Sequence, residues 1–470
     1  MQIHHLRHPR TLGRSHDRRK SLQTIIGIRR EDKDVAEQRA PLAPSHVREL
    51  TQKYHIAVHV EPATNRIFTD DEYRHGGATL ATDAPDCRIV FGTKEIPIAR
   101  LLPEKVYCFF SHTIKGQPYN MPMLRHILAT RSTLIDYERV VDEQGRRLIF
   151  FGRFAGCAGM IRSLWAYGRR LATEGYETPF AQVKRAYHYH SLEEARQAMS
   201  AIGAEIRHGG LPAALGPVVC GFAGYGNVSK GAQEIYDLLP VREVTPQQLS
   251  ELTTTASHSS REVYKVVFRE EDMVAPAVTG REFSLSEYFQ HPERYRSRFA
   301  VHLPHLSLLI NAIYWAPQYP RLVTIDYLKQ AYNANSTPRL RVIGDISCDI
   351  GGAIECTVEV TSFENPVYVY DPATEQITYG LTGNGPVILA LDRLPNEFSQ
   401  ESTEAFGNAL MPFIPAMAAA DYTQPFDQLA LPAPIKRAVI THQGELTPDY
   451  RYLHEYLAGA THDLSKRNFS

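Results

Sequence analysis

The chain has 470 residues, of which 43% are hydrophobic and 22% are charged, and its formal net charge is −1. This length exceeds what one hydrophobic core supports, so two or more domains are expected. The balanced charge argues against a nucleic-acid or membrane-surface binder, and no apolar run reaches the roughly 18 residues of a membrane span. The six cysteines lack a CxxC pair, which indicates reduced thiols and no metal site.

The first 22 residues are rich in Arg and His and lack the apolar segment of a secretory signal. We expect 1–22 to be a flexible basic tail and the protein to be cytoplasmic. A mitochondrial transit peptide, and with it the mitochondrial matrix, is the alternative, because Asp17 is the single acidic residue of this segment.

Apolar, strand-like runs alternate with helical stretches through the first 150 residues. The expected strands are 23–29, 56–60, 88–93 and 106–111. The expected helices are 44–54 and 121–129, and a longer one follows at 158–172 with apolar residues at helical spacing. This alternation predicts a parallel sheet with helical crossovers.

Residues 218–239 form a short apolar strand, a glycine turn and an amphipathic helix. Glycine at 221, 224 and 226 lets the backbone approach a pyrophosphate, and the N–H groups at the start of the helix can bind that anion. The context of strand, turn and helix indicates a dinucleotide site. The cofactor contacts expected at this turn come from Gly224, Gly226, Asn227, Val228 and Ser229.

Later segments supply a second sheet and complete the first domain. Strands at 305–314 and 340–346 suit the second half of a doubly wound sheet, and the polar, aromatic-rich stretch 251–297 is interpreted as a covering insertion. Beyond Gly352 we expect strands at 357–360 and 367–370 and a helix at 402–411, which return to the first domain.

The predicted fold is therefore α/β, with two Rossmann-like domains that have parallel sheets and an active-site cleft between them. The expected substrate-binding domain is discontinuous, 23–150 plus 353–460. The expected dinucleotide-binding domain is 151–352. Four strand ends of the first domain supply Lys, Arg, His or Glu, which can bind carboxylates and transfer protons.

Several segments, in the same order, resemble the lysine–2-oxoglutarate reductase domain of α-aminoadipic semialdehyde synthase over about residues 25–452. The resemblance extends more distantly to single-chain lysine-forming saccharopine dehydrogenases and to alanine dehydrogenases. The matching segments are 29–32, 39–44, 109–115, 224–233, 291–295 and 345–352. It implies that the chain ends where the reductase domain would end and lacks the saccharopine-oxidising half of the fused enzymes, which leaves a separate saccharopine-oxidising enzyme as one alternative.

The resemblance also implies a reaction, in which L-lysine, 2-oxoglutarate and a reduced nicotinamide give saccharopine. Motif matching makes Lys94 and His112 the acid–base pair and Arg39 a carboxylate clamp. The further substrate contacts that it implies are Glu37, Glu95, Lys115, Glu138 and Arg147. Cofactor contacts are also expected from Asn311, Ile313 and Asp349, the last matching an aspartate beside the nicotinamide, with Asp345 as the alternative.

The strand after the glycine turn bears on the choice of cofactor. Folds that select NAD usually place Asp or Glu at the tip of the second strand, about 20 residues beyond the glycines. Thr245 occupies the expected tip and Glu243 lies within the strand, while Arg242 and Lys230 could meet a 2′-phosphate. NADP is therefore expected in preference to NAD, although the single-chain relatives favour NAD.

Two other functions compete with this interpretation. An alanine-dehydrogenase-like amino-acid oxidoreductase would share Lys94, His112 and Arg39, but it would need fewer cations than saccharopine requires. A non-catalytic nucleotide sensor would keep the glycine turn without the pair of Lys94 and His112. The oligomeric state stays open, with a homo-oligomer as one alternative.

Overall fold

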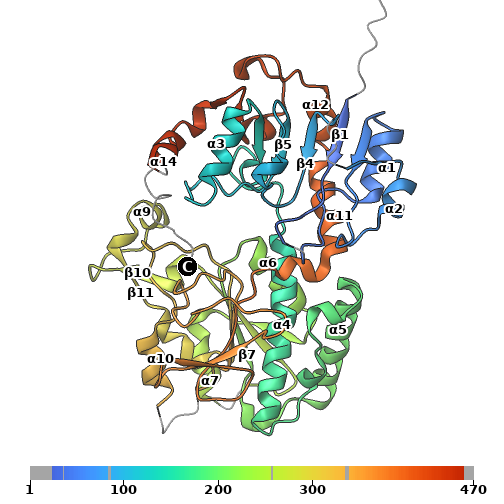
Figure 1. Ribbon diagram of the computed structural model, residues 1–470. Coiled ribbons are helices and arrows are strands. Elements are labelled where there is room, and N and C mark those ends of the chain that lie inside the picture. Colours follow the sequence, from blue (N-terminus) through green and yellow to red (C-terminus); the bar gives the residue numbers. More distant parts are fainter. Residues whose placement is uncertain (1–23, 35, 83–85, 256–257, 334–337, 460–470) are drawn as a thin grey trace, which may run out of the picture.

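The computed structural model describes residues 24–34, 36–82, 86–255, 258–333 and 338–459. The chain forms two α/β parts, each built on an eight-stranded sheet (Figure 1). The predicted fold class is confirmed by these two sheets of mostly parallel strands. The basic tail expected at 1–22 lies outside the described residues. Within the described ranges, no helix is long and apolar enough to cross a membrane.

The first sheet has the strand order β18-β17-β6-β5-β4-β1-β2-β3. Its strands are β1 (Ile25–Ile28), β2 (Ala57–Val60), β3 (Thr79–Leu80), β4 (Ile89–Phe91), β5 (Val106–Phe109), β6 (Thr133–Asp136), β17 (Val439–His442) and β18 (Glu445–Leu446). Strands β1 to β6 run parallel, whereas β17 is antiparallel to β6 and to β18. The helices of this part are α1 (Pro44–Gln52), α2 (Asp70–His75), α3 (Met121–Ala129), α11 (Ser399–Leu410), α12 (Ile414–Ala419), α13 (Ala433–Arg437) and α14 (Leu453–Gly459).

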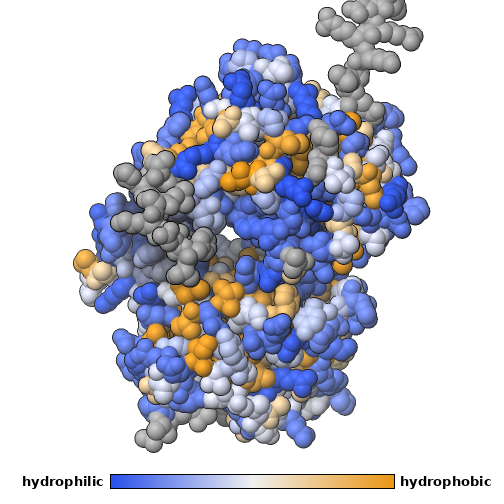
Figure 2. All heavy atoms as spheres, in the orientation of Figure 1, coloured by the Kyte–Doolittle hydropathy of each residue, from blue (hydrophilic) through white to orange (hydrophobic). Residues whose placement is uncertain are grey.

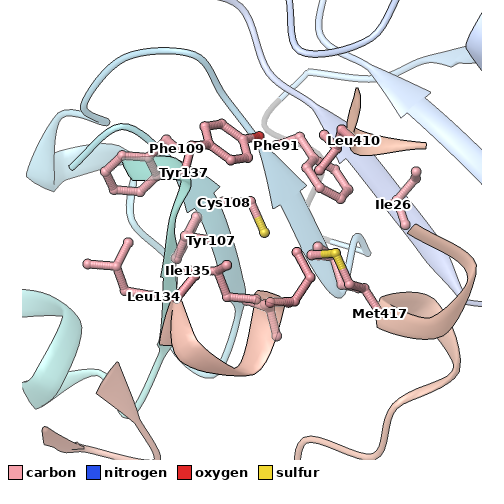
Figure 3. Close-up of a cluster of buried hydrophobic side chains, with 14 of the residues drawn as sticks. Ile26, Phe91, Tyr107, Cys108, Phe109, Leu134, Ile135, Tyr137, Leu410 and Met417 are labelled. Atoms are coloured by element: carbon pink, nitrogen blue, oxygen red, sulfur yellow. The ribbon is translucent and has the colours of Figure 1, made fainter. Parts of the chain in front are cut away.

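The core of the first part explains why its strands are short apolar runs. Every residue of β5 is buried, as expected for a parallel strand covered on both faces. Leu410 of α11 and Met417 of α12 pack with Ile26, Phe91 and Cys108 of the sheet (Figure 3). The C-terminal helices therefore complete a core that the first 150 residues begin.

The second sheet has the strand order β15-β14-β16-β13-β12-β7-β9-β8. Its strands are β7 (Val219–Ala223), β8 (Val241–Glu243), β9 (Val263–Phe268), β12 (Leu308–Asn311), β13 (Val342–Asp345), β14 (Tyr368–Asp371), β15 (Gln376–Tyr379) and β16 (Val387–Leu389). Its larger helices are α4 (Gly152–Thr173), α5 (Leu192–Gly209), α6 (Asn227–Tyr236), α7 (Leu249–Thr254) and α10 (Ile325–Ala331).

The expected return to the first domain at residue 353 is wrong. Strand β14, which overlaps the predicted strand 367–370, pairs antiparallel with β15 and β16, and β16 pairs with β13 in the second sheet. Residues 357–360 form no strand. The chain re-enters the first core only with α11, after the 3₁₀ helix η10 (Leu394–Phe398). Sequence pattern identified the strand, but its apolar residues fit either sheet equally well.

The expected covering insertion at 251–297 is also wrong in part. Strand β9 lies inside this range and pairs with both β7 and β8, so it is a central strand of the second sheet. The remainder holds α8 (Glu270–Met273), α9 (Leu285–Gln290) and a two-stranded antiparallel ribbon of β10 (Val274–Pro276) and β11 (Tyr295–Ser297). Only this later half lies outside the sheet.

Glycines let α4 and α6 approach each other closely. A Cβ on Gly156 would lie 1.9 Å from the Val228 carbonyl oxygen, and a Cβ on Gly231 would lie 2.0 Å from the Arg153 carbonyl oxygen. Only glycine avoids these backbone overlaps. The contact holds the start of α6, which follows the glycine turn, against the helix that enters from the first part.

Candidate active site

The polar residues predicted from the strand ends meet at one edge of the first sheet. Strands β1, β4, β5 and β6 are parallel, so their carboxyl ends lie side by side. Glu31, Lys94 and His112 follow three of these ends. Figure 2 shows the surface hollowed between the two parts of the molecule, with hydrophilic residues around the opening.

Glu31 fixes the backbone beside Lys94. Its carboxylate accepts hydrogen bonds from the Thr93 N–H at 2.5 Å and from the Lys94 N–H at 2.9 Å. Burial raises the pKa of Glu31 to about 7, against the opposing effect of these two hydrogen bonds and of Arg29. Glu31 was not among the predicted site residues, although its place in the 29–32 segment at a strand end was the available signal.

The side chain of Lys94 is half-buried at this edge. Within the part of the chain that the structure describes, its Nζ has no hydrogen bond or ion pair, and none joins it to His112. The Lys94 backbone is fixed by Glu31, while its Nζ makes no such bond among the described residues and is available to bind a substrate group.

His112 belongs to a charged network with Glu95 and Lys33. His112 Nδ1 lies 2.8 Å from Glu95 Oε1, and Lys33 Nζ lies 2.7 Å from Glu95 Oε2. Burial works against ionisation of Glu95, but His112 and Lys33 together hold its pKa at about 2. An ionised carboxylate only accepts, so Nδ1 donates and Nε2 is left as the nitrogen that can exchange a proton.

The backbone also constrains His112. Its φ of 48° lies in the left-handed region, which is uncommon for a residue other than glycine. The Asn120 side-chain amide donates to the Ser111 carbonyl at 3.0 Å and to the His112 carbonyl at 3.3 Å, which holds this turn. The ring of Phe110 stacks on the imidazole at 6.4 Å.

Arg39 and Glu37, predicted as separate substrate contacts, form a buried bidentate pair. Arg39 Nε donates to one Glu37 oxygen at 2.7 Å and Nη2 to the other at 2.6 Å. The guanidinium also lies 4.2 Å from the centroid of the Phe151 ring. Glu37 therefore occupies the fork that was expected to clamp a substrate carboxylate, and Nη1 is the remaining donor edge.

Lys115 reaches the second part of the molecule. Its Nζ lies 5.0 Å from the centroid of the Tyr314 ring. Burial raises the pKa of Asp349, and the charge of Lys115 opposes that shift. A first-sheet lysine therefore faces a second-sheet aspartate. Glu138 and Arg147, also predicted as substrate contacts, pair with each other at 3.2 Å.

The glycine turn has the geometry of an anion cradle. Gly224 has a φ of +92°, which favours glycine, and Gly226 is the N-cap residue of α6. A Cβ built on Gly226 meets nothing within 4 Å, so open space lies before the helix. Gly221, in contrast, lies within β7, where a Cβ would crowd Phe268 and Leu306. The turn fits a dinucleotide pyrophosphate, which Gly226 and the first N–H groups of α6 would hold.

A second set of polar groups lies at the ends of β12 and β13. Asn311 is buried and donates to Asp345 at 2.8 Å, while its own Oδ1 has no hydrogen-bond partner among the described residues. Burial raises the pKa of Asp345 to about 6. The unpaired amide oxygen fits a donor such as a nicotinamide carboxamide. Asp345 is buried, whereas Asp349 is half-buried and close to Lys115.

Strand order changes one expectation about the cofactor. Thr245 does not lie at the tip of the strand next to β7, because β9 separates β7 from β8. Arg242 and Thr245 are exposed on the edge strand and just beyond it. The residues at the neighbouring tip are Arg269 and Glu270, which directly follow β9. Their distance along the chain from the glycine turn hid them from sequence analysis.

The described residues contain no group of three or more His, Cys, Asp or Glu side chains that could hold a metal ion. All six cysteines are free, five of them buried and Cys348 intermediate.

Comparison with solved structures shows the same fold in two proteins. An L-alanine dehydrogenase aligns with a TM-score of 0.57 and 18% identity over 92% of this chain and 100% of its own. A transhydrogenase from Sinorhizobium meliloti aligns with a TM-score of 0.53 and 15% identity over 90% of this chain and 99% of its own.

Sequence comparison then identifies the family. Residues 27–158 match the alanine dehydrogenase/PNT N-terminal domain and residues 241–449 match the alanine dehydrogenase/PNT C-terminal domain. The chain belongs to the alanine dehydrogenase/PNT family.

Curated relatives are more specific. The mitochondrial alpha-aminoadipic semialdehyde synthase of Mus musculus is 37% identical over 91% of this chain and 47% of its own length. The Arabidopsis thaliana synthase is 37% identical over 93% of this chain and 42% of its own length. A lysine-forming NAD⁺ saccharopine dehydrogenase of Neurospora crassa is 26% identical over 83% of this chain and 90% of its own length. The chain spans about half the length of the synthases that it matches.

The Glu95 network predicts a defined acid dependence of stability. The pKa of Glu95 is about 2 in the folded protein against an ordinary 4.5, so its ionised form stabilises the fold above pH 4.5, and this contribution is lost as the pH falls toward 2. We expect Glu95→Gln to lower the free energy of unfolding by about 1.5–3 kcal/mol at pH 7, with a smaller difference at pH 3. Urea unfolding at both values measures this. The exposed Glu445→Gln is the control, and equal losses at both values would contradict the role of the ionised carboxylate.

Proposed function

We propose that this protein is a lysine–2-oxoglutarate reductase, which condenses L-lysine with 2-oxoglutarate and reduces the imine with NADPH to give saccharopine. The synthases and saccharopine dehydrogenases that it resembles support the substrates. The observation that carries the proposal is the presence of an uncommitted Lys94 and of the hydrogen-bonded Glu95 and His112 at neighbouring strand ends of the first sheet.

The chain's own residues account for the proton steps. The ε-amine of the substrate attacks the ketone carbon, and the resulting carbinolamine loses water to form the imine. Lys94 and His112 take protons from the amine and return one to the leaving hydroxyl, the His112 proton moving through Nε2 because Glu95 holds Nδ1. The reduced nicotinamide supplies the hydride that reduces the imine carbon.

Saccharopine carries three carboxylates, so its site needs several cations. Lys115 faces the second part of the molecule, and Lys33 and Arg39 lie on the same first-domain segment, each already beside a glutamate. We propose that Lys115 and the Nη1 edge of Arg39 bind carboxylates, and that Arg147 does so by leaving Glu138. Glu138, Glu37 and Glu95 would receive the lysine end of the substrate or tune these cations.

The other partners follow from the same proposal. We expect NADPH in preference to NADH, with a homo-oligomer as one alternative for the assembly. The compartment that we propose is cytoplasmic. The mitochondrial matrix is the alternative, because the mouse and cattle relatives are named mitochondrial.

Substrate dependence tests the reaction. We expect oxidation of NADPH by the purified protein to require both lysine and 2-oxoglutarate, with at most a trace rate when either is withheld. The loss of nicotinamide absorbance measures this. Equal rates with pyruvate and ammonia would replace the proposal by an alanine dehydrogenase, and binding of dinucleotide without turnover of any substrate would replace it by a nucleotide sensor.

Gly226 tests the dinucleotide site. Its Cβ position is open, so Gly226→Val should fold normally by circular dichroism while its side chain fills the space of the pyrophosphate. We expect the Kd for NADPH to rise by about tenfold or more, which corresponds to about 1.4 kcal/mol. Gly209→Val, at another glycine whose Cβ meets nothing within 4 Å, is the control. Unchanged affinity would return the turn to a structural role.

The acid–base pair has its own kinetic signature. Lys94→Met and His112→Gln should each lower kcat by about 10²–10⁴ and flatten one limb of the pH profile. The double variant should lose much less than the product of the two losses, because both groups act on one proton path. The exposed Lys53→Met and His75→Gln are matched controls. A wild-type pH profile in both single variants would refute the assignment.

A further inference from the structure

We propose that Arg269, at the end of β9, binds the ribose 2′-phosphate of NADPH and is the residue that selects NADPH over NADH. The inference rests on the proposed dinucleotide site, and it assigns the selecting residue to the end of β9, farther along the chain than the roughly 20 residues usual after the glycine turn. Three observations carry it: the order of the strands, the contacts of Arg269, and the position of the competing Arg242.

Strand order places Arg269 beside the glycine turn. Strand β9 pairs with β7 along the whole of β7, from Val219 opposite Tyr264 to Ala223 opposite Phe268. The Gly224 N–H donates to the Phe268 carbonyl at 3.1 Å, so the turn is joined directly to the end of β9. Strand β12 lies on the other side of β7.

The two halves of a dinucleotide separate across this turn. With the pyrophosphate at the start of α6, one nucleoside of the dinucleotide would lie toward the end of β9 and the other toward the end of β12. The unpaired Oδ1 of Asn311 at the end of β12 suits the nicotinamide half. The adenosine ribose would then lie at the end of β9, where Arg269 is the first residue beyond the strand.

Contacts at the end of β9 hold Arg269 ready for an anion. Its guanidinium lies 5.1 Å from the centroid of the Tyr225 ring, and Tyr225 belongs to the glycine turn itself. The Arg269 N–H donates to Asp272 at 2.9 Å, which fixes the backbone at the start of α8. The side chain is exposed and has no ion pair among the described residues. Its planar fork can therefore bind a phosphate bidentately.

Glu270 lies next to Arg269 and opposes part of this charge. Its carboxylate accepts a hydrogen bond from the Tyr225 hydroxyl at 3.1 Å, so it is already partly engaged. A carboxylate at this place accepts hydrogen bonds from the ribose hydroxyls of NADH and repels a 2′-phosphate. Glu270 therefore opposes the selection of NADPH that the Arg269 guanidinium makes.

Arg242 is the competing cation. It lies on β8, which is separated from β7 by β9. Two strand spacings place β8 about 10 Å from β7. Arg242 is also exposed on this edge strand, which makes it a matched control of the same residue type.

Equilibrium binding of NADPH and NADH, followed by titration calorimetry without substrates, tests the assignment. We expect Arg269→Ala to weaken NADPH binding by about 10–100-fold, as for a charge-assisted hydrogen bond, and to leave the NADH affinity within about twofold. Glu270→Gln should tighten NADPH relative to NADH. Arg242→Ala should leave both affinities within about twofold of wild type.

The outcomes separate the two proposals. The inference is wrong if Arg269→Ala leaves the ratio of the NADPH and NADH affinities unchanged. It is also wrong if Arg242→Ala, instead, selectively weakens NADPH binding. In both cases the dinucleotide site itself would stand. Failure of the wild-type protein to bind either dinucleotide would overturn the proposed function. Circular dichroism of each variant checks that the substitution leaves the fold intact.

Discussion

The ring of Phe151 stacks on the ring of Phe406, and this contact joins the two segments of chain that connect one sheet to the other. The rings lie 4.6 Å apart at an interplanar angle of 13°. Phe151 precedes α4 on the way out, and Phe406 lies in α11 on the way back. Arg39 lies on the other side of this contact, over Phe151. The crossing, the first core and a substrate-binding candidate therefore share one aromatic cluster.

A buried ion pair fastens the returning segment to the second part. Arg162 of α4 and Glu397 of η10 pair with both side chains fully buried. Burial raises the pKa of Glu397, and the charge of Arg162 opposes that shift. Removing one partner of such a pair would leave a buried charge, which is strongly destabilising. Together with the aromatic contact, the pair anchors both segments of chain that link the two sheets.

Within the first part, carboxylates place the groups that would do chemistry. Glu31 holds the Lys94 backbone through N–H groups, and Glu95 sets the tautomer of His112. These contacts span 63 and 17 residues of sequence. Arg39 was expected to clamp a substrate carboxylate, but the neighbouring Glu37 carboxylate already binds two of its guanidinium nitrogens. A cation in the sequence is thus not automatically a free cation in the site.

The sequence alone determined much of this protein. Apolar runs and helical spacing predicted α1, α3 and strands β1, β2, β4 and β5 to within a few residues, because burial and periodicity are local properties. The glycine turn and the α/β class followed from the same local rules. The resemblance to the lysine-forming reductases, carried by short motifs, is upheld by the relatives at 37% identity.

Only the tertiary structure decided which sheet each strand joined. Strand β14 returned to the second sheet and β9 inserted beside β7, although neither pairing leaves a local mark in the sequence. Strand pairing depends on which apolar surfaces remain uncovered once all helices have packed, and this is a property of the whole chain. Arg269 therefore became a neighbour of the glycine turn, and Arg242 did not, for a reason that no spacing along the chain could reveal.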